Sequence, residues 1–304
     1  MAAPRILVIK LGALGDIVQA LGPMAAIRRH HADAHVVLLT SAPFAEFLRG
    51  SPYADEVWVD RRPRLLDLPG ILRLRRRLRV GGFARVYDLQ TSDRSSFYYC
   101  LLGPGARPEW SGIARGASHR QGDPGRERMH TLERQRDQLR IAGIAEVPPP
   151  DLSWVKADLR GFDLPERFAV LIPGGAAHRP EKRWPVERYA ALAAWLRARG
   201  VTPVTIGGEA ERPLGAAIPA SRDLTGRTSF VEVAAIGRRA LWAIGSDTGP
   251  MHLMVAAGAP ATVLFSAASD PALTAPRGGR VTILRRERLA DLPVEEVAAT
   301  VAIG

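Results

Sequence analysis

The stretch "AIGSDTGPMHLMVAAGAP", residues 243–260, decides how we interpret this chain, because it joins an apolar strand pattern to a helix of small and apolar residues. The joint between the two is the short sequence SDTGP. A strand-to-helix turn leaves free backbone N–H groups at the start of the helix, where the peptide dipoles favour an anion. We therefore expect a phosphate there, with His252 as a further donor. The alternative is that Asp247 or Thr248 only caps the helix.

Apolar segments of strand length recur in both halves of the chain, and a longer segment with helical spacing follows each of them. Strands that alternate with helices predict parallel sheets with right-handed crossovers, covered by helices on both faces. The sequence HADAH, residues 31–35, fits this scheme as a helix end followed by a strand start. The expected strands lie at residues 5–10, 34–40, 56–60, 84–90, 168–174, 201–208, 240–247, 261–266 and 281–286.

The length of 304 residues favours two domains, because a typical domain has about 100 to 200 residues. Residues 145–168 contain four prolines and little periodicity, which suits a connection. We place the boundary near residue 150, between two Rossmann-like, doubly wound domains, 1–150 and 151–304. Ligands bind beyond the carboxyl ends of strands in such sheets. The α/β domains are therefore expected to face each other across a central cleft with loops from both.

The formal net charge of +11 and the pI near 10.8 indicate an anionic partner, which is a nucleic acid, a lipid surface or a phosphorylated substrate. No RNA-binding signature, zinc-ligand spacing or basic stripe with aromatic residues is present, so a basic nucleic-acid-binding protein is the weaker alternative and we expect no nucleic acid partner. No apolar run approaches the roughly 20 residues of a membrane helix, and the N-terminus lacks secretory features. We expect a cytoplasmic location. The single cysteine excludes a multi-cysteine metal site.

The first candidate site is "KLGALGDIVQA", residues 10–20, which follows the first expected strand. Gly12 and Gly15 permit a tight backbone and the close approach of a ligand. Asp16 stands at the start of the next helix, where it is a catalytic candidate or only a helix cap. The spacing is not the GxGxxG of dinucleotide-binding proteins, which argues against NAD.

Two further candidates follow strands of the second half. Lys182 precedes the start of a helix at Trp184 and Pro185, where a cation would neutralise a diphosphate; the alternative is a solvated loop. Glu209 comes directly after a strand that ends in two glycines, where a carboxylate can accept both hydroxyls of a ribose; the alternative is a first-turn helix residue. Together with the stretch at 243–260, all candidate sites fall in loops that follow strands.

The chain also resembles a known family. The segments "ILVIKLGALGD", "PGGAAHRPEKRWP" and "GSDTGPMHLMVAAGAP" are similar, in order and spacing, to glycosyltransferase family 9, the heptosyltransferases of lipopolysaccharide core synthesis. The resemblance implies a GT-B fold and an inverting transfer that needs neither a metal nor a cofactor. It also implies that the second domain binds a nucleotide-diphosphate sugar, ADP-heptose or a related donor. The first domain then binds the acceptor, an anionic lipid-linked or other glycan of lipopolysaccharide type.

The resemblance also assigns residues. Asp16 matches the catalytic base and Lys182 the lysine that contacts the diphosphate, and both are taken as catalytic. The donor-binding candidates are Glu209 for the ribose, Thr228 for the nucleoside, and Asp247, Thr248, Gly249 and His252 for the sugar and phosphates. The acceptor-binding candidates of the first domain are Lys10, Gly12, Gly15, Gln90 and Arg94. Residues 88–96 and 129–139, which the resemblance places near the acceptor, match the family only loosely.

Residues 64–80 combine leucine and isoleucine with six arginines. This segment is either an ordinary surface helix whose leucines face the core or a basic, partly apolar surface for an anionic lipid, in peripheral contact with the inner membrane. The activity also has an alternative, a nucleotide-sugar epimerase of similar architecture. An epimerase would release an altered sugar without any acceptor.

Overall fold

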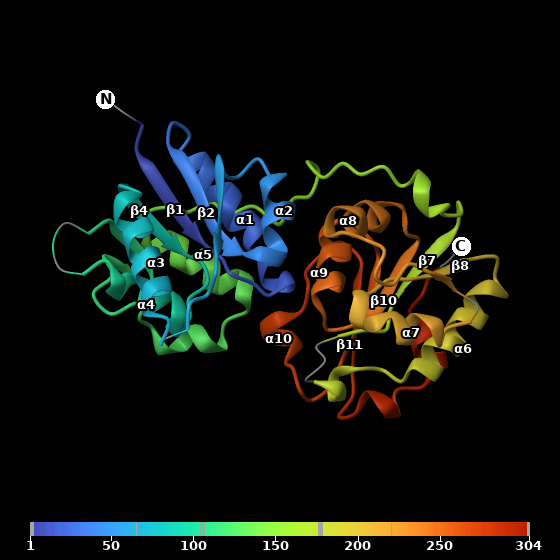
Figure 1. Ribbon diagram of the computed structural model, residues 1–304. Coiled ribbons are helices and arrows are strands. Elements are labelled where there is room, and N and C mark those ends of the chain that lie inside the picture. The colour runs from blue at the N-terminus through green and yellow to red at the C-terminus, as the bar shows by residue number, and fades with distance from the viewer. Residues whose placement is uncertain are drawn as a thin grey trace. The chain divides into compact units, whose positions relative to one another are not determined.

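A computed structural model describes residues 3–64, 66–103, 105, 107–175, 179–219 and 221–302. The chain divides into two compact units, Met1–Pro150 and Asp151–Gly304, which we call unit 1 and unit 2 (Figure 1). Residues 142–159 join them without a helix or a strand, as the prolines of this segment favour. A short 3₁₀ helix, η2 (Arg160–Phe162), follows.

Unit 1 contains one parallel sheet with the strand order β3-β2-β1-β4-β5-β6. Its strands are β1 (Arg5–Ile9), β2 (His35–Ser41), β3 (Glu56–Asp60), β4 (Phe83–Asp88), β5 (Glu109–Gly112) and β6 (His119–Arg120). Its helices are α1 (Leu14–His30), α2 (Ala42–Arg49), α3 (Leu68–Val80), α4 (Asp93–Leu101), η1 (Pro124–Arg128) and α5 (Thr131–Ile141). The strand order reverses between β1 and β4, the place where doubly wound sheets bind ligands.

Both faces of the unit 1 sheet are buried, as the continuous apolar runs of its strands require. Leu7 and Ile9 of β1 lie in one core cluster with Leu74 and Leu78 of α3 and with tyrosines of α4. Ile6 and Val8 point to the other face and are equally buried. α1 and α5 pack against each other. The sheet therefore lies between helices, and its carboxyl edge is left for polar loops.

Unit 2 repeats this architecture with the strand order β12-β11-β10-β7-β8-β9, again parallel throughout. Its strands are β7 (Phe168–Ile172), β8 (Thr202–Thr205), β9 (Arg222–Asp223), β10 (Trp242–Ser246), β11 (Ala261–Phe265) and β12 (Val281–Arg285). Its helices are η3 (Pro180–Lys182), α6 (Val186–Arg197), η4 (Glu209–Glu211), α7 (Arg212–Ala216), α8 (Phe230–Arg239), α9 (Gly249–Ala256), α10 (Pro271–Thr274), η5 (Leu289–Asp291) and α11 (Val294–Ala299).

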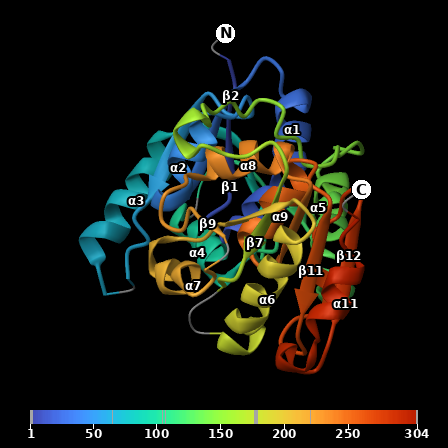
Figure 2. The same ribbon diagram turned by 90° about the vertical axis from the view of Figure 1, so that its right-hand side faces the viewer.

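The core of unit 2 is built in the same way. Leu171 of β7 and Ile244 of β10 pack with Tyr189 and Leu192 of α6 and with Val297 of α11. α6 packs against α11, and α8 packs against α9 (Figure 2). Small residues allow the second pair to approach closely, since a Cβ at Gly237 would lie 3.0 Å from the Met254 sulfur.

The nine strands expected from the sequence are all present, and the predicted α/β class is confirmed. The expectation for HADAH is confirmed as well, because α1 ends at His30 and β2 begins at His35. Three short strands were not expected: β6 and β9, which form sheet edges, and β5, which lies next to β6. Within the described ranges, no helix is long and apolar enough to cross a bilayer.

Candidate active site

A polar pocket of about 170 Å³ lies in unit 1 where β1 and β4 end. It brings together three residues that the sequence predicts for the site: Lys10, Asp16 and Gln90. Gln90 is fixed in place because its Oε1 accepts a hydrogen bond of 2.8 Å from the Leu11 N–H. The other lining residues are Leu89, Thr91, Thr131, Arg134, Gln135 and Gln138.

Asp16 is the third residue of α1, and its side chain is half-buried. Its Oδ2 accepts a 3.1 Å hydrogen bond from the N–H of Ala13 before the helix. The carboxylate thus caps α1 and also lines the pocket, so the two interpretations of Asp16 are compatible. Gly12, with φ of +133°, needs the freedom of glycine, since a Cβ there would lie 2.6 Å from the Phe44 ring. Gly15 lies beside Asp16 in the first turn.

Lys10 is only 4% exposed, and its Nζ donates a 3.0 Å hydrogen bond to the Leu89 carbonyl. Burial lowers the pKa of Lys10, and the charges of Asp16 and Asp88 partly oppose this. Burial also raises the pKa of Asp88 to about 6, against hydrogen bonds from the Thr91 and Gln90 N–H groups and the charge of Lys10. The pocket is therefore lined by a buried amine, and the buried carboxyl group of Asp88 lies next to the lining residue Leu89 in the chain without forming an ion pair with Lys10.

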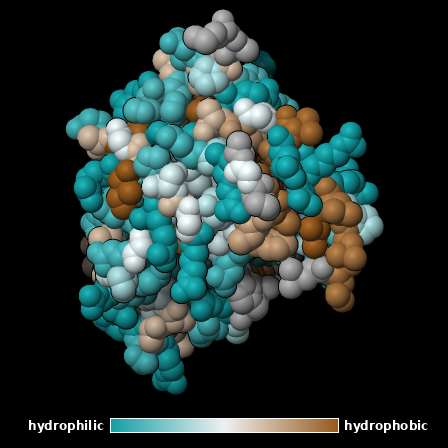
Figure 3. Space-filling model, turned by 90° about the vertical axis from the view of Figure 1, so that its left-hand side faces the viewer, coloured by the Kyte–Doolittle hydropathy of each residue, from teal (hydrophilic) through white to brown (hydrophobic). Residues whose placement is uncertain are grey.

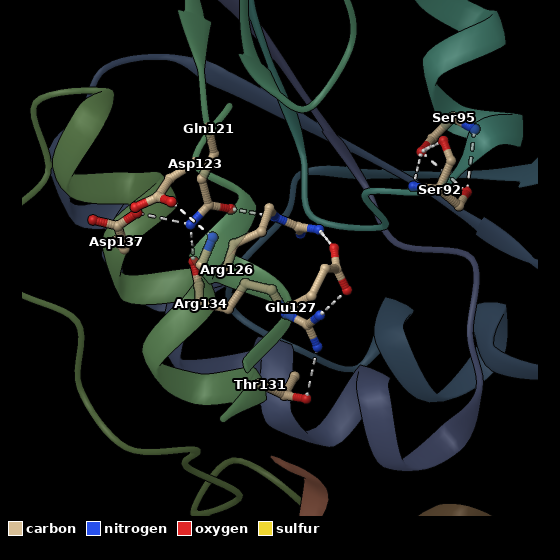
Figure 4. A network of polar contacts seen from close by, with 10 residues as sticks. Ser92, Ser95, Gln121, Asp123, Arg126, Glu127, Thr131, Arg134 and Asp137 are labelled. Atoms are coloured by element: carbon tan, nitrogen blue, oxygen red, sulfur yellow. Dashed lines mark hydrogen bonds and ion pairs between the residues drawn. The ribbon is translucent and has the colours of Figure 1, made fainter. Parts of the chain in front are cut away.

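The α5 side of the pocket carries residues of the segment 129–139, which the resemblance places near the acceptor without assigning any single residue of it. Arg134 reaches from α5 to Glu127, with 3.4 Å between Nη1 and Oε2, and to Thr131, with 3.2 Å between Nη2 and Oγ1 (Figure 4). Arg134 is half-buried, and this burial together with the charge of Arg126 lowers its pKa. The Oε1 atoms of Gln135 and Gln138 are buried and have no hydrogen-bond partner among the described residues. Both glutamines line the pocket.

Arg94, a predicted acceptor contact, lies elsewhere in unit 1. It belongs to the first turn of α4, and its Nη1 donates a 3.3 Å hydrogen bond to the Pro63 carbonyl. It does not line the pocket that contains Lys10 and Asp16.

In unit 2, three predicted residues form a charged group at the carboxyl end of β10. Lys182 Nζ lies 2.9 Å from Asp247 Oδ2, and His252 Nε2 lies 3.7 Å from Asp247 Oδ1. Only 14% of the Lys182 side chain and 11% of that of Asp247 are exposed. Burial by itself would raise the pKa of Asp247, but hydrogen bonds and charge from His252 and Lys182 lower it to about 2. The carboxylate is therefore ionised and holds the lysine in place.

The start of α9 lies next to this charged group. Thr248 is the N-cap residue of the helix, yet its side chain makes no capping hydrogen bond, and its Oγ1 is buried without a partner among the described residues. Gly249 is the first residue of α9. A helix N-terminus with free N–H groups and an unpaired hydroxyl suits an anion. Thr248 thus occupies the cap position but does not make the side-chain hydrogen bond that the capping alternative predicts.

Two more loops meet at the same edge of the unit 2 sheet. Glu211, which the sequence did not single out, accepts hydrogen bonds from the N–H groups of Gly175 at 2.8 Å and Gly208 at 2.6 Å. It ties the loop after β7 to the loop after β8. Glu209 is exposed and pairs with Arg212, with 2.6 Å between Oε1 and Nε. Residues 176–178, part of the segment that carries the resemblance, lie outside the described residues.

Thr228 is half-buried in the loop before α8, directly ahead of its N-cap Ser229. The Gly226 N–H donates to the Gly207 carbonyl at 2.8 Å, and a Cβ at Gly226 would lie 2.5 Å from Glu209 Oε2. The loops of Glu209 and Thr228 are therefore neighbours. Across the described residues, no group of three or more His, Cys, Asp or Glu side chains is placed to hold a metal ion.

Comparison with known proteins places these two sites in context. The model of glycosyltransferase family 9 (heptosyltransferase) matches residues 71–298. The lipopolysaccharide core heptosyltransferase OpsX of Haemophilus influenzae is 21% identical over 291 residues, which cover 90% of this chain and 82% of that protein.

Among solved structures, a family 9 glycosyltransferase from Veillonella parvula is similar with a TM-score of 0.83 and 20% identity, over 99% of this chain and 97% of the other. The E. coli heptosyltransferase WaaC, solved with ADP, has a TM-score of 0.75 and 20% identity over 97% of this chain and 98% of the other. At this identity the likeness shows the fold, and the predicted GT-B class with two α/β domains is confirmed.

Proposed function

The chain belongs to glycosyltransferase family 9, the heptosyltransferase family, and from this premise we propose that it transfers a heptose or a related sugar from ADP-heptose to a lipopolysaccharide-type or other glycan acceptor. Unit 2 binds the donor, and unit 1 binds the acceptor. The relatives OpsX and WaaC support this choice of substrates, since the first is a lipopolysaccharide core heptosyltransferase and the second was solved with ADP.

The observation that carries the proposal is the buried contact between Lys182 and Asp247 beside the start of α9. Lys182 is held at 2.9 Å by the carboxylate, so its ammonium group is fixed before a ligand arrives. Thr248 Oγ1 and the first N–H groups of α9 supply further donors. Together they would bind the diphosphate of the donor, while Glu209 accepts hydrogen bonds from the ribose and Thr228 contacts the nucleoside.

Asp16 acts as the general base in a single displacement. The acceptor hydroxyl oxygen attacks the anomeric carbon while the bond from this carbon to the diphosphate oxygen breaks, and Asp16 takes the proton of the hydroxyl. The electron pair of the broken bond leaves with ADP, and the anomeric configuration inverts. Lys10, Gly12, Gly15 and Gln90 shape the acceptor side, and Arg134 adds a cation to it. Arg94 remains a candidate for a more distant part of the acceptor.

The same donors explain why the proposed reaction needs no metal or cofactor. Negative charge grows on the diphosphate as it leaves, and Lys182 with the N–H groups of Thr248 and Gly249 stabilises this charge. Turnover should therefore be unchanged in the presence of a chelator. A loss of activity that divalent ions restore would contradict this part of the proposal.

The donor assignment is tested by calorimetric titration of ADP, UDP and GDP. We expect ADP to bind most tightly, and Lys182→Met to weaken ADP binding by about 10- to 100-fold, because a hydrogen bond to a charged group contributes about 1.5 to 3 kcal/mol. Lys156→Met is the matched control, since Lys156 is an exposed lysine of the same unit. Parental affinity in Lys182→Met would refute the diphosphate contact, and a preference for UDP or GDP would refute the ADP donor.

A further inference from the structure

The segment Arg61–Val80 takes no part in either proposed substrate site. It contains eight arginines and one acidic residue, Asp67, so it carries most of the formal net charge of +11 of the chain. The ion pairs of the described residues involve none of these arginines. Arg75 and Arg77 donate to backbone carbonyls, and Arg77 also lies over the Trp58 ring, but these contacts do not neutralise their charge.

The structure divides the apolar residues of this segment into two groups. Leu74 and Leu78 are buried in the core of unit 1, as expected for an ordinary surface helix. The second group faces solvent: the exposed fractions are 95% for Leu66, 65% for Leu68, 58% for Leu72 and 77% for Val80. Folding does not explain this second group, because burial would stabilise such side chains by about 1.5 to 3 kcal/mol each.

The exposed apolar residues of α3 share one side of the helix with arginines, and Leu66 precedes the helix. At 3.6 residues per turn, Leu68, Leu72 and Arg76 lie on the side opposite Leu74 and Leu78, with Arg79 and Val80 beside them. Figure 3 views this side of unit 1 and shows hydrophobic side chains protruding among hydrophilic ones at the right edge. We call residues 66–80 the α3 surface.

A pocket of about 330 Å³ lies between α3 and the end of β3. Arg61, Arg73 and Arg77 line it. Its two carboxylates are already engaged, because Asp60 Oδ2 accepts a 2.5 Å hydrogen bond from the Tyr98 hydroxyl and Asp67 Oδ1 accepts one of 2.9 Å from the Gly70 N–H. The pocket therefore holds three arginines against two carboxylates, in a space large enough for a phosphate headgroup.

We propose that the α3 surface docks on an anionic lipid membrane, with its exposed leucines and Val80 in the interface and its arginines on the headgroups. Basic helices with exposed apolar residues bind such surfaces through both effects. A second copy of the chain is a poorer partner, because two arginine-rich surfaces would repel each other. The proposal does not depend on sugar transfer, because vesicle binding needs neither donor nor acceptor.

The experiment is co-sedimentation of the full chain with vesicles of phosphatidylcholine alone or mixed in equal parts with phosphatidylglycerol. We expect binding to the anionic vesicles that weakens as salt rises above about 0.1 M. The variant Arg73→Gln/Arg76→Gln/Arg79→Gln should bind about 100-fold more weakly, since each arginine near the surface contributes about fivefold. The variant Leu66→Gln/Leu68→Gln/Leu72→Gln should also lose binding, at every salt concentration.

The matched control is Arg160→Gln/Arg197→Gln/Arg280→Gln, which removes the same charge from exposed positions of unit 2. It should retain binding within a few-fold, and both α3 variants should retain the parental circular dichroism and melting temperature. Equal binding to neutral and anionic vesicles, or equal losses in the control and the arginine variant, would overturn the proposal. So would a parental dimer, seen by analytical ultracentrifugation, that the leucine variant converts to a monomer while vesicle binding persists.

Discussion

Asp88 and Asp247 lie at the carboxyl ends of corresponding strands in the two units, yet their environments drive their ionisation in opposite directions. Asp88 ends β4 and Asp247 follows β10, and both carboxyl groups are withdrawn from water. The pKa of Asp88 is raised to about 6 by burial. Burial acts on Asp247 too, but His252 and Lys182 contact it and lower its pKa to about 2. The difference lies in direct contact with a cation, because Lys10 donates to the Leu89 carbonyl instead of Asp88.

This difference shows how each site is prepared for its proposed ligand. In unit 2 the cation is already neutralised and fixed, so a diphosphate would meet a preorganised ammonium group. In unit 1 the polar groups that line the pocket are incompletely paired: Gln135 and Gln138 each hold a buried oxygen without a described partner. A hydroxylated acceptor would satisfy them. Substitutions of single residues in each site test this difference between the two units.

The largest effect is expected for Asp16→Asn. Asparagine keeps an oxygen for the hydrogen bond from the Ala13 N–H but cannot take a proton. We expect kcat to fall by about 10²- to 10⁴-fold, the usual contribution of a general base, with an unchanged dissociation constant for ADP. The control is Asp67→Asn, because Asp67 caps α3 through the Gly70 N–H without lining the Lys10 pocket. A parental kcat in Asp16→Asn, or equal losses in both variants, would rule out the base assignment.

Asp247→Asn should have a smaller effect than Asp16→Asn. This effect is a loss of folding stability that should depend on pH. Because the pKa of Asp247 is lower in the folded state than its usual value near 3.8, its contribution to stability is present above about pH 4 and is lost as the pH falls toward 2. The variant should therefore be less stable than the parent by about 2 kcal/mol at pH 7, with the difference vanishing near pH 2.

Denaturant titrations across this pH range measure the predicted difference. Asp33→Asn, at an exposed position, serves as the control and should stay within about 0.5 kcal/mol of the parent. A stability difference for Asp247→Asn that persists unchanged at pH 2 would show that the ion pair is not its cause.

Arg134→Gln tests the acceptor side with a smaller expected effect. The loss of a charged donor from the pocket should raise the acceptor KM by about tenfold and leave the ADP dissociation constant unchanged. Arg136→Gln is matched to it, since Arg136 is an exposed arginine on the same helix. If Arg136→Gln raises the acceptor KM equally, the general positive charge of α5 is responsible instead of this position.

The smallest effect is expected for Glu209→Gln. Glu209 is exposed and already pairs with Arg212, so its net gain from binding a ribose is limited. ADP affinity should fall by about two- to tenfold, measured by calorimetry. Glu187→Gln, an exposed glutamate of α6, should leave ADP affinity at the parental value. Unchanged ADP binding in Glu209→Gln would remove Glu209 from the donor site.

The sequence predicted the long buried strands because their apolar runs are a strong local signal. It could not predict β5, β6 and β9, since these have two to four residues and polar sequences such as HR and RD. Lys10, Asp16 and Gln90 could be predicted to lie at one edge because each follows a parallel strand. Arg134 reaches that edge from a helix distant in sequence; the resemblance placed its segment, 129–139, near the acceptor, but no local pattern indicated this residue.

The sequence could not predict the direction of individual side chains either. Arg94 is close to Gln90 in the chain, but α4 begins at Asp93 and carries Arg94 to the Pro63 carbonyl. Glu209 and Glu211 are two residues apart, and only the structure shows that Glu211 ties two loops together while Glu209 stays exposed. The arginine-rich pattern of α3 is compatible both with an ordinary surface helix and with a lipid-binding surface. Only the structure shows that the helix has two different sides, because Leu74 is buried and Leu72 is exposed.

In the proposed reaction, the donor and the acceptor react directly with each other on this chain. Its most direct test follows ADP release and sugar products from ADP-heptose, with and without a lipopolysaccharide core acceptor, by chromatography and NMR. We expect ADP release to require the acceptor and to yield one glycan with inverted anomeric configuration. Conversion of the donor sugar at the same rate without any acceptor, as an epimerase would give, would contradict it.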